Sequence, residues 1–294
     1  MSELADSYAR DGFAVLRGAV GPARLQTLRD EVLRVGRGDR GAVFGQAIVQ
    51  GGTDDETLSN ILAIHFPHKI SDVYRSALSE PAVVDALTRL IGPDVKAVQS
   101  MLFVKPPGKP GQPWHQDEHF IPTRDRSLTG VWIALDDADE DNGCLWAIPG
   151  SHQRGVLYPM RPQSEPGWDL SEVLHGFPDD VATAQPIPVK AGDAILFNGY
   201  VIHGSFANTS PTRTRRALVN HYMNARSLLP WAMGVPGGGA REDARDIVMV
   251  AGEDPYAWKG SEDLWPAFIR PDGAAANAAL RAEMSNTHVF GNSA

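Results

Sequence analysis

Cysteine is nearly absent from this chain, since Cys144 is the single one among 294 residues. An internal disulfide is therefore excluded, and the apolar run around Cys144 predicts a packed thiol rather than a nucleophile. Long hydrophobic runs are missing too, because no stretch approaches the ~18 apolar residues of a membrane span. Residues 1–10 carry charges where a secretory signal has an apolar segment. We expect a soluble protein of the cytoplasm.

The chain also lacks a surplus of positive charge. Asp and Glu total 36 against 27 Lys and Arg, so the net charge is −9. This balance provides no electrostatic reason to bind nucleic acid or an anionic membrane, and a small molecule is the expected partner. We expect one domain over 1–294, with helices in about 1–92, a β core in about 93–225 and an extension in about 226–294. Composition leaves the oligomeric state open.

Periodicity predicts helices first and strands afterwards. Apolar residues recur at helical spacing after Pro22 and again after Pro81. From residue 95 the period is that of a strand, and strict alternation places Ala97 and Met101 on one face and Leu102 on the other. Turn residues separate the expected strands, which are 95–105, 129–135, 143–148, 193–197 and 215–223. This pattern predicts a mainly β fold with flanking helices, an antiparallel jelly roll or double-stranded β-helix.

Two stretches interrupt the strand pattern. Residues 158–188 are rich in Pro and Gly, and residues 231–271 include three consecutive glycines. Long loops on a sheet scaffold either cover a binding site or run over the surface, and the sequence leaves both interpretations open.

A short segment, Trp114-His115-Gln116-Asp117, carries the strongest chemical signal. In an extended backbone His115 and Asp117 project to the same side, so both can reach one metal ion. His119 continues that side, but three residues in a line reach past a single centre. We therefore expect a remote third ligand, because two imidazoles and one carboxylate can hold iron by one face and leave positions open for ligands.

His203 is the candidate for that third ligand. It follows an apolar strand and a turn at Asn198-Gly199. An isolated histidine is seldom a ligand, but an arginine-rich strand begins soon after it, at Arg215 and Arg216. A guanidinium that points inward from such a strand needs an anion, and a dicarboxylate ligand would supply one through two parallel hydrogen bonds.

Several motifs in a fixed order resemble the phytanoyl-CoA dioxygenase branch of the iron(II)- and 2-oxoglutarate-dependent oxygenases. The similarity extends from about residue 11 to residue 222. The motifs that carry it are 11–16, 101–107, His115-Gln116-Asp117, 142–145 with 149–152, His203-Gly204-Ser205 with Asn208, and the strand from Arg215. The resemblance implies that His115, Asp117 and His203 bind Fe(II). It further implies contacts to the cosubstrate 2-oxoglutarate from Arg215, Ser205, Trp132, Met101 and Gln99.

The arginine departs from the family pattern. It usually lies eleven residues after the distal histidine, and Thr214 stands at that position here. An insertion of one residue in 209–214 restores Arg215, while Arg216 remains the competing assignment. Strand alternation favours Arg215, since it shares a face with His221. For His221 itself, a hydrogen bond to a ligand and simple packing are both open.

The resemblance implies hydroxylation of an unactivated C–H bond in a small organic molecule, with O2 consumed and succinate and CO2 released. Asp117 argues against halogenation, which requires that the carboxylate position be vacated for chloride. An acidic chain also offers little for the phosphates of a CoA ester. Two alternatives share the ligand set. One is a non-catalytic jelly-roll sensor that binds a metal and a dicarboxylate, and the other is a zinc hydrolase.

Other polar residues near these motifs are expected to be structural. This holds for His65, His68, His119 and His152. Lys105 and Lys109 flank the expected mouth of the site, where they would meet a substrate phosphate or carboxylate, but lysines beside Pro-Gly turns are usually solvated.

Overall fold

The computed structural model describes residues 2–41, 43–45, 52–169, 171–229, 247–261, 266–270, 278–280 and 282. Within these residues, no helix has the length and apolar character needed to cross a membrane. The helices are α1 Ser2–Asp11, α2 Pro22–Gly36, α3 Asp54–Ser59, α4 Asp72–Ala77 and α5 Pro81–Leu90. Short 3-10 helices are η1 Pro67–Lys69, η2 Asp117–His119, η3 Ser151–Arg154, η4 Val181–Thr183 and η5 Ala257–Lys259. The helices expected at Pro22 and Pro81 are confirmed.

The described strands form two main antiparallel sheets and a small hairpin. The major sheet runs in the order β1 Phe13–Leu16, β10 Ala194–Asn198, β5 Thr129–Ala134, β12 Arg215–Asn224, β3 Val95–Lys105, β2 Ala63–His65 and β14 Phe268–Arg270, and β13 Val248–Ala251 also pairs with β3. The minor sheet runs β4 Gln112–His115, β11 His203–Ser205, β6 Leu145–Ala147 and β9 Gln185–Ile187. The hairpin is β7 Met160–Arg161 with β8 Val173–Leu174.

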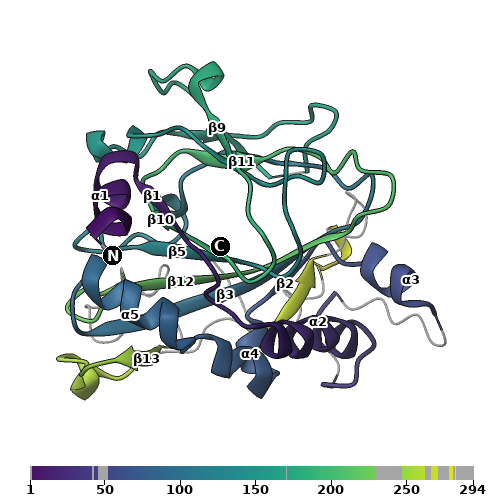
Figure 1. Cartoon of the computed structure of the whole chain (residues 1–294), viewed down its shortest axis with the longest axis horizontal. Coiled ribbons are helices and arrows are strands. Elements are labelled where there is room, and N and C mark those ends of the chain that lie inside the picture. Colours follow the sequence, from purple (N-terminus) through teal and green to yellow (C-terminus); the bar gives the residue numbers. More distant parts are fainter. Residues whose placement is uncertain are drawn as a thin grey trace.

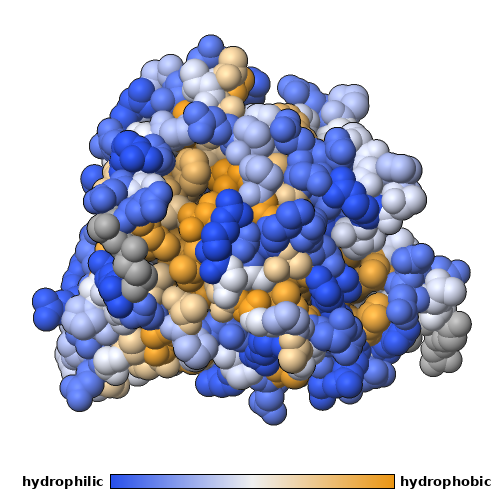
Figure 2. All heavy atoms as spheres, viewed as in Figure 1, coloured by the Kyte–Doolittle hydropathy of each residue, from blue (hydrophilic) through white to orange (hydrophobic). Residues whose placement is uncertain are grey.

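The two sheets face one another, and helices α2, α4 and α5 lie against the outer side of the major sheet (Figure 1). This is the expected jelly roll with flanking helices. Apolar residues gather at the centre of the face seen in Figure 2, with hydrophilic residues around them. Because the two sheets face one another (Figure 1), they bound the interior of the fold, and each strand can present alternate side chains to it.

Strand alternation divides the apolar residues between two cores. On β5, Val131 and Ile133 pack toward the helices, in a cluster that includes Leu28 of α2. Trp132 and Ala134 point the other way, into a cluster between the two sheets. That inner cluster also contains Cys144, which is fully buried, and burial raises the pKa of its thiol to about 11. The expected packed thiol is therefore confirmed.

A β-bulge interrupts the alternation expected along 95–105. The register with β12 passes from His221 opposite Gln99 to Tyr222 opposite Ala97, which leaves Val98 as the extra residue. Ala97 consequently packs in the helix-side cluster with Leu102. The expectation that Ala97 shares the face of Met101 is wrong, because one inserted residue reverses every face beyond it.

The two long stretches contain more strand than the sequence suggested. Residues 158–188 hold β7, β8 and β9, while β13 and β14 from 231–271 join the major sheet. Much of 231–271 lies outside the described residues. An ion pair between Asp169 and Arg270 connects the two stretches. Asp169 also lines the interior cavity, so the first stretch contributes to the site rather than only to the surface.

Candidate active site

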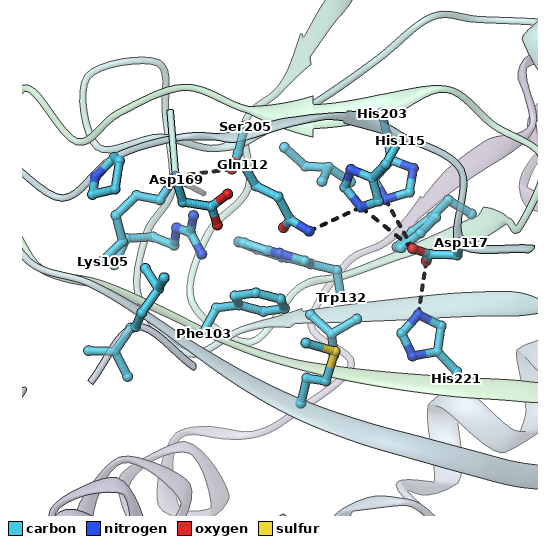
Figure 3. A pocket seen from close by; sticks show the side chains of 18 residues that line it. Phe103, Lys105, Gln112, His115, Asp117, Trp132, Asp169, His203, Ser205 and His221 are labelled. Atoms are coloured by element: carbon cyan, nitrogen blue, oxygen red, sulfur yellow. Dashed lines mark hydrogen bonds and ion pairs between the residues drawn. The ribbon is translucent and has the colours of Figure 1, made fainter. Parts of the chain in front are cut away.

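Two strands of the minor sheet and the turn beyond one of them bring three metal-binding side chains together. His115 ends β4 and is the cross-strand partner of His203, the first residue of β11, so their ring centroids lie 4.1 Å apart. Asp117 begins η2, and its Oδ1 lies 3.6 Å from the Nε2 of each histidine. The ligand atoms of all three lie within 4.8 Å of one another, and the three residues are buried. Figure 3 shows them converging at one end of the cavity.

The turn after β4 explains why Asp117 is a candidate ligand and His119 is not. Gln116 keeps an extended backbone, and its buried side chain donates hydrogen bonds to the carbonyls of Tyr200 and Val156. The chain then enters the 3-10 helix η2, which ends the straight strand geometry at Asp117. His119 is exposed and does not line the cavity.

Backbone carbonyls orient both imidazoles. Nδ1 of His115 lies 2.7 Å from the carbonyl of Pro113, and Nδ1 of His203 lies 2.9 Å from the carbonyl of Val201. Because a carbonyl can only accept, each Nδ1 carries the proton and each Nε2 presents a lone pair to the centre. The amide Nε2 of Gln112 lies 3.2 Å from Nε2 of His115, which agrees with that nitrogen being an acceptor.

The charge states of His203 and Asp117 suit a cation. Burial, followed by the nearby His115, lowers the pKa of His203 to about 4, so its imidazole is neutral at pH 7. Burial works against ionisation of Asp117, but His203, His221 and His115 outweigh it and hold the pKa of Asp117 well below its ordinary value. A carboxylate and neutral imidazoles are the forms that bind divalent metals.

His221 on β12 fixes the orientation of Asp117. Its Nε2 donates a hydrogen bond of 2.9 Å to Oδ2, which leaves Oδ1 facing the two histidines. Of the two interpretations that the sequence left open, the hydrogen bond is the one present.

Replacing His221 by leucine should weaken metal binding by about tenfold or more, since partners that orient a metal ligand contribute on the order of 10- to 100-fold in affinity. Competition with a coloured chelator would measure the change. The conservative variant His221→Gln, which keeps a donor, should recover most of the affinity. Equal affinity in His221→Leu and the wild type would show that the hydrogen bond does not matter for the metal.

Arg215 lies in the same cavity as the three candidate ligands. Its side chain is 3% exposed, its guanidinium lies over the ring of Trp132 at 5.4 Å, and burial lowers its pKa to about 10. Among the described residues it takes part in no ion pair, and its Nε has no hydrogen-bond partner. Arg216 instead points to the helix side, where Nε and Nη2 each donate a 2.8 Å hydrogen bond to Asp136.

Most of the other residues expected to contact a cosubstrate also line the cavity. Met101, Trp132 and Ser205 do so, whereas Gln99 stands opposite His221 in the β12 register and is not among the lining residues. Three further polar residues line the cavity, namely Gln112, Lys105 and Asp169. Of these, the sequence had singled out Lys105 alone, at the expected mouth of the site.

The expectation that Lys105 is solvated is wrong, because it is 5% exposed. Its position on the cavity face of β3, two residues beyond Phe103, was the available signal. For Asp169 no signal existed, since it lies in a stretch without periodicity.

Three other histidines make contacts away from the cavity. His65 stacks on Phe268 with ring centroids 4.2 Å apart, and Nδ1 of His68 lies 2.6 Å from the hydroxyl of Ser100. His152 lies against the carbonyl of Ala9. These contacts agree with the structural roles expected of them.

Comparison with solved structures places the fold among non-heme oxygenases. The non-heme monooxygenase ThoJ aligns with a TM-score of 0.64 and 21% identity over 97% of both chains. The epimerase SnoN, solved in complex with Fe3+, alpha ketoglutarate and nogalamycin RO, aligns with a TM-score of 0.60 and 19% identity over 86% of this chain and 96% of its own. At these identities the likeness concerns the fold alone.

Sequence relatives agree on one family. Phytanoyl-CoA dioxygenase 1 of Oryza sativa subsp. japonica is 37% identical over 162 residues, which cover 54% of this chain and 56% of the rice protein. The peroxisomal phytanoyl-CoA dioxygenase of Rattus norvegicus is 28% identical over 276 residues, or 88% of this chain and 78% of its own. The match thus spans little more than half of the rice protein. Because the model of the family Phytanoyl-CoA dioxygenase (PhyH) matches residues 8–217, this chain belongs to the phytanoyl-CoA dioxygenase family.

Proposed function

We propose that this protein is an Fe(II)- and 2-oxoglutarate-dependent oxygenase that hydroxylates an unactivated C–H bond of a small organic molecule and releases succinate and CO2. One observation carries the proposal. A set of two imidazoles and one carboxylate shares a cavity with Arg215, a buried guanidinium that forms no ion pair within the described residues. A structural metal site or a hydrolase has no need of that arginine.

The residues that line the cavity fit both iron(II) and 2-oxoglutarate. Two imidazoles and a carboxylate form the donor set of non-heme iron sites with open positions. The unpartnered Arg215 fits a carboxylate, which a planar guanidinium binds through two parallel hydrogen bonds. When bound, iron(II) with 2-oxoglutarate and dioxygen supplies the oxidant for the C–H bond.

The protein contributes binding, orientation and exclusion of water. His115, Asp117 and His203 hold the metal, while Arg215 and Ser205 bind the distal carboxylate of 2-oxoglutarate. Trp132 and Met101 line the space between these two ends, and Gln99 stays a proposed contact on the neighbouring part of β3. Leu145, Phe197 and Val219 complete an apolar lining, which keeps water from the reacting groups.

Anaerobic titration of the Fe(II)-loaded protein with 2-oxoglutarate tests the assignment without the substrate. We expect a visible charge-transfer absorption that saturates at one cosubstrate per iron. Admission of oxygen with a suitable substrate should then couple oxygen uptake to succinate release. Absence of the absorption would refute the proposal, and hydrolysis supported by zinc without oxygen would favour a hydrolase. A chelate that never yields succinate across a broad substrate panel would favour a sensor.

Product analysis separates hydroxylation from related outcomes. A hydroxylase inserts one oxygen atom from labelled O2 into its product. Neighbours in fold include a protein described as an epimerase and one described as a carbocyclase. A product of this chain that gains no labelled oxygen would contradict hydroxylation while leaving the oxidative site intact.

A further inference from the structure

Lys105 is a second buried basic side chain in the cavity, beside Arg215. It is the last residue of β3, and its cross-strand partner on β12 is Arg215. Its Nζ donates hydrogen bonds to Oγ of Ser205 at 3.0 Å and to the carbonyl of Phe206 at 2.7 Å. Figure 3 shows Lys105 at the end of the cavity away from the metal triad, near Asp169. An ammonium has three N–H donors, so one is left for a ligand.

The surrounding backbone is shaped to hold this ammonium. Gly143 has φ +79°, and a Cβ added there would lie 2.6 Å from the carbonyl oxygen of Phe206 and 3.0 Å from Cδ of Lys105. Only glycine fits such a position without strain. Asn208 donates to the backbone carbonyl of Lys105 at 2.8 Å, which fixes the end of the strand. The side chain of Lys105 is therefore held in one position inside the protein.

The charges at this end of the cavity are not balanced. In the described part of the chain, no carboxylate lies within ion-pair distance of either Lys105 or Arg215, and Asp169 is already paired with Arg270. Burial, and then the repulsion from Arg215, lower the pKa of Lys105 well below its ordinary value. Two adjacent buried cations are costly, and an anion that binds between them offsets that cost and favours the protonated form of Lys105.

We propose that Lys105 is a second cationic contact for the distal carboxylate of the 2-oxo acid, acting with Arg215 and Ser205. It makes the site select a dicarboxylate over a monocarboxylate of the same length. This inference rests on the proposed function, because it concerns the cosubstrate of that same site. The family resemblance implied contacts to 2-oxoglutarate from Arg215 and Ser205, but it implied none from Lys105.

The test compares the binding of two ligands, 2-oxoglutarate and 2-oxovalerate, by variants of two lysines, Lys105 and Lys109. Lys105→Met removes the charge with little change in volume, and Lys105→Gln also removes the charge but keeps an N–H donor for Ser205 and Phe206. Lys109→Met is the matched control, since Lys109 lies in the loop that follows Lys105 but does not line the cavity. Each Fe(II)-loaded protein is titrated without oxygen, once with 2-oxoglutarate and once with 2-oxovalerate, which lacks the distal carboxylate.

We expect both Lys105 variants to bind 2-oxoglutarate at least about tenfold more weakly, because hydrogen bonds to charged groups are each worth about that much or more. Their affinity for 2-oxovalerate, their iron content and their melting temperature should stay near those of the wild type. Lys105→Arg should recover most of the lost affinity, and Lys109→Met should match the wild type for both ligands.

Unchanged affinity for 2-oxoglutarate in Lys105→Gln would overturn the inference. Equal losses for the two ligands would overturn it as well, since they would show a structural role instead of a contact with the carboxylate. Failure of the wild type to form a chelate with either ligand is a different result, because it refutes the proposed function itself.

Discussion

Replacing His115 by alanine should reduce the iron content of the protein from one atom per chain to nearly none. His115 and His203 are cross-strand partners, and removal of one imidazole leaves a single histidine and one carboxylate, too few donors to retain Fe(II). At neutral pH, protons do not compete with the metal for His203 or Asp117, because His203 is neutral and Asp117 is ionised. Metal analysis after gel filtration, with circular dichroism to check the fold, measures the effect.

His119→Ala is the control for this experiment. His119 belongs to the same segment, two residues beyond Asp117, and it is exposed. The structure therefore predicts full iron content in that variant. Stoichiometric iron retained by His115→Ala, or iron lost from His119→Ala, would contradict the assignment of the ligands.

Where the chain is regular, the sequence was sufficient to predict which side of a strand each residue occupies. The register between β12 and β3 is continuous from Arg215 to His221, so simple alternation placed both residues on the inner face. The same reasoning failed at Ala97, because a bulge depends on how a partner strand pairs and leaves no mark in the local pattern.

In the candidate metal site, His115 and Asp117 are close in the sequence, whereas His203 is remote from them. The His-x-Asp spacing pointed to two candidate ligands, although the chain turns into a 3-10 helix at Asp117 rather than continuing as a strand. That turn depends on buried contacts of Gln116 with residues 156 and 200, which are remote in sequence. The position of Asp169 in the cavity also depends on a residue remote in sequence, because its segment has no periodicity and an ion pair joins it to Arg270.

Burial of charge was the hardest feature to foresee. Lysine beside a Pro-Gly turn is ordinarily solvated, and Lys105 is not, because Gly143 and the backbone of Phe206 form a polar enclosure around it. The enclosure comes from two segments that are remote from β3 in the sequence, so only the assembled fold reveals it. The structure likewise separates the positions of Arg215 and Arg216, since Arg215 lines the cavity and Arg216 pairs with Asp136 outside it.

Replacing Arg215 or Arg216 by methionine should therefore have opposite effects on binding and stability. Arg215→Met should weaken 2-oxoglutarate binding at least about a hundredfold, since it removes two hydrogen bonds to a charged group worth about 1.5–3 kcal/mol each. Its ligand-free form should melt no lower than the wild type, because an unpartnered buried charge is lost.

Arg216→Met should keep the affinity for 2-oxoglutarate and lose stability. Its two hydrogen bonds to Asp136 disappear, and although Arg29 still lies 3.4 Å from that carboxylate, we expect a loss of about 1–3 kcal/mol. Urea unfolding of the ligand-free proteins and anaerobic titration of the iron-loaded ones measure the two quantities separately. If Arg216→Met lost affinity while Arg215→Met kept it, the carboxylate contact would belong to Arg216, and the inner face of β12 would have no part in binding the cosubstrate.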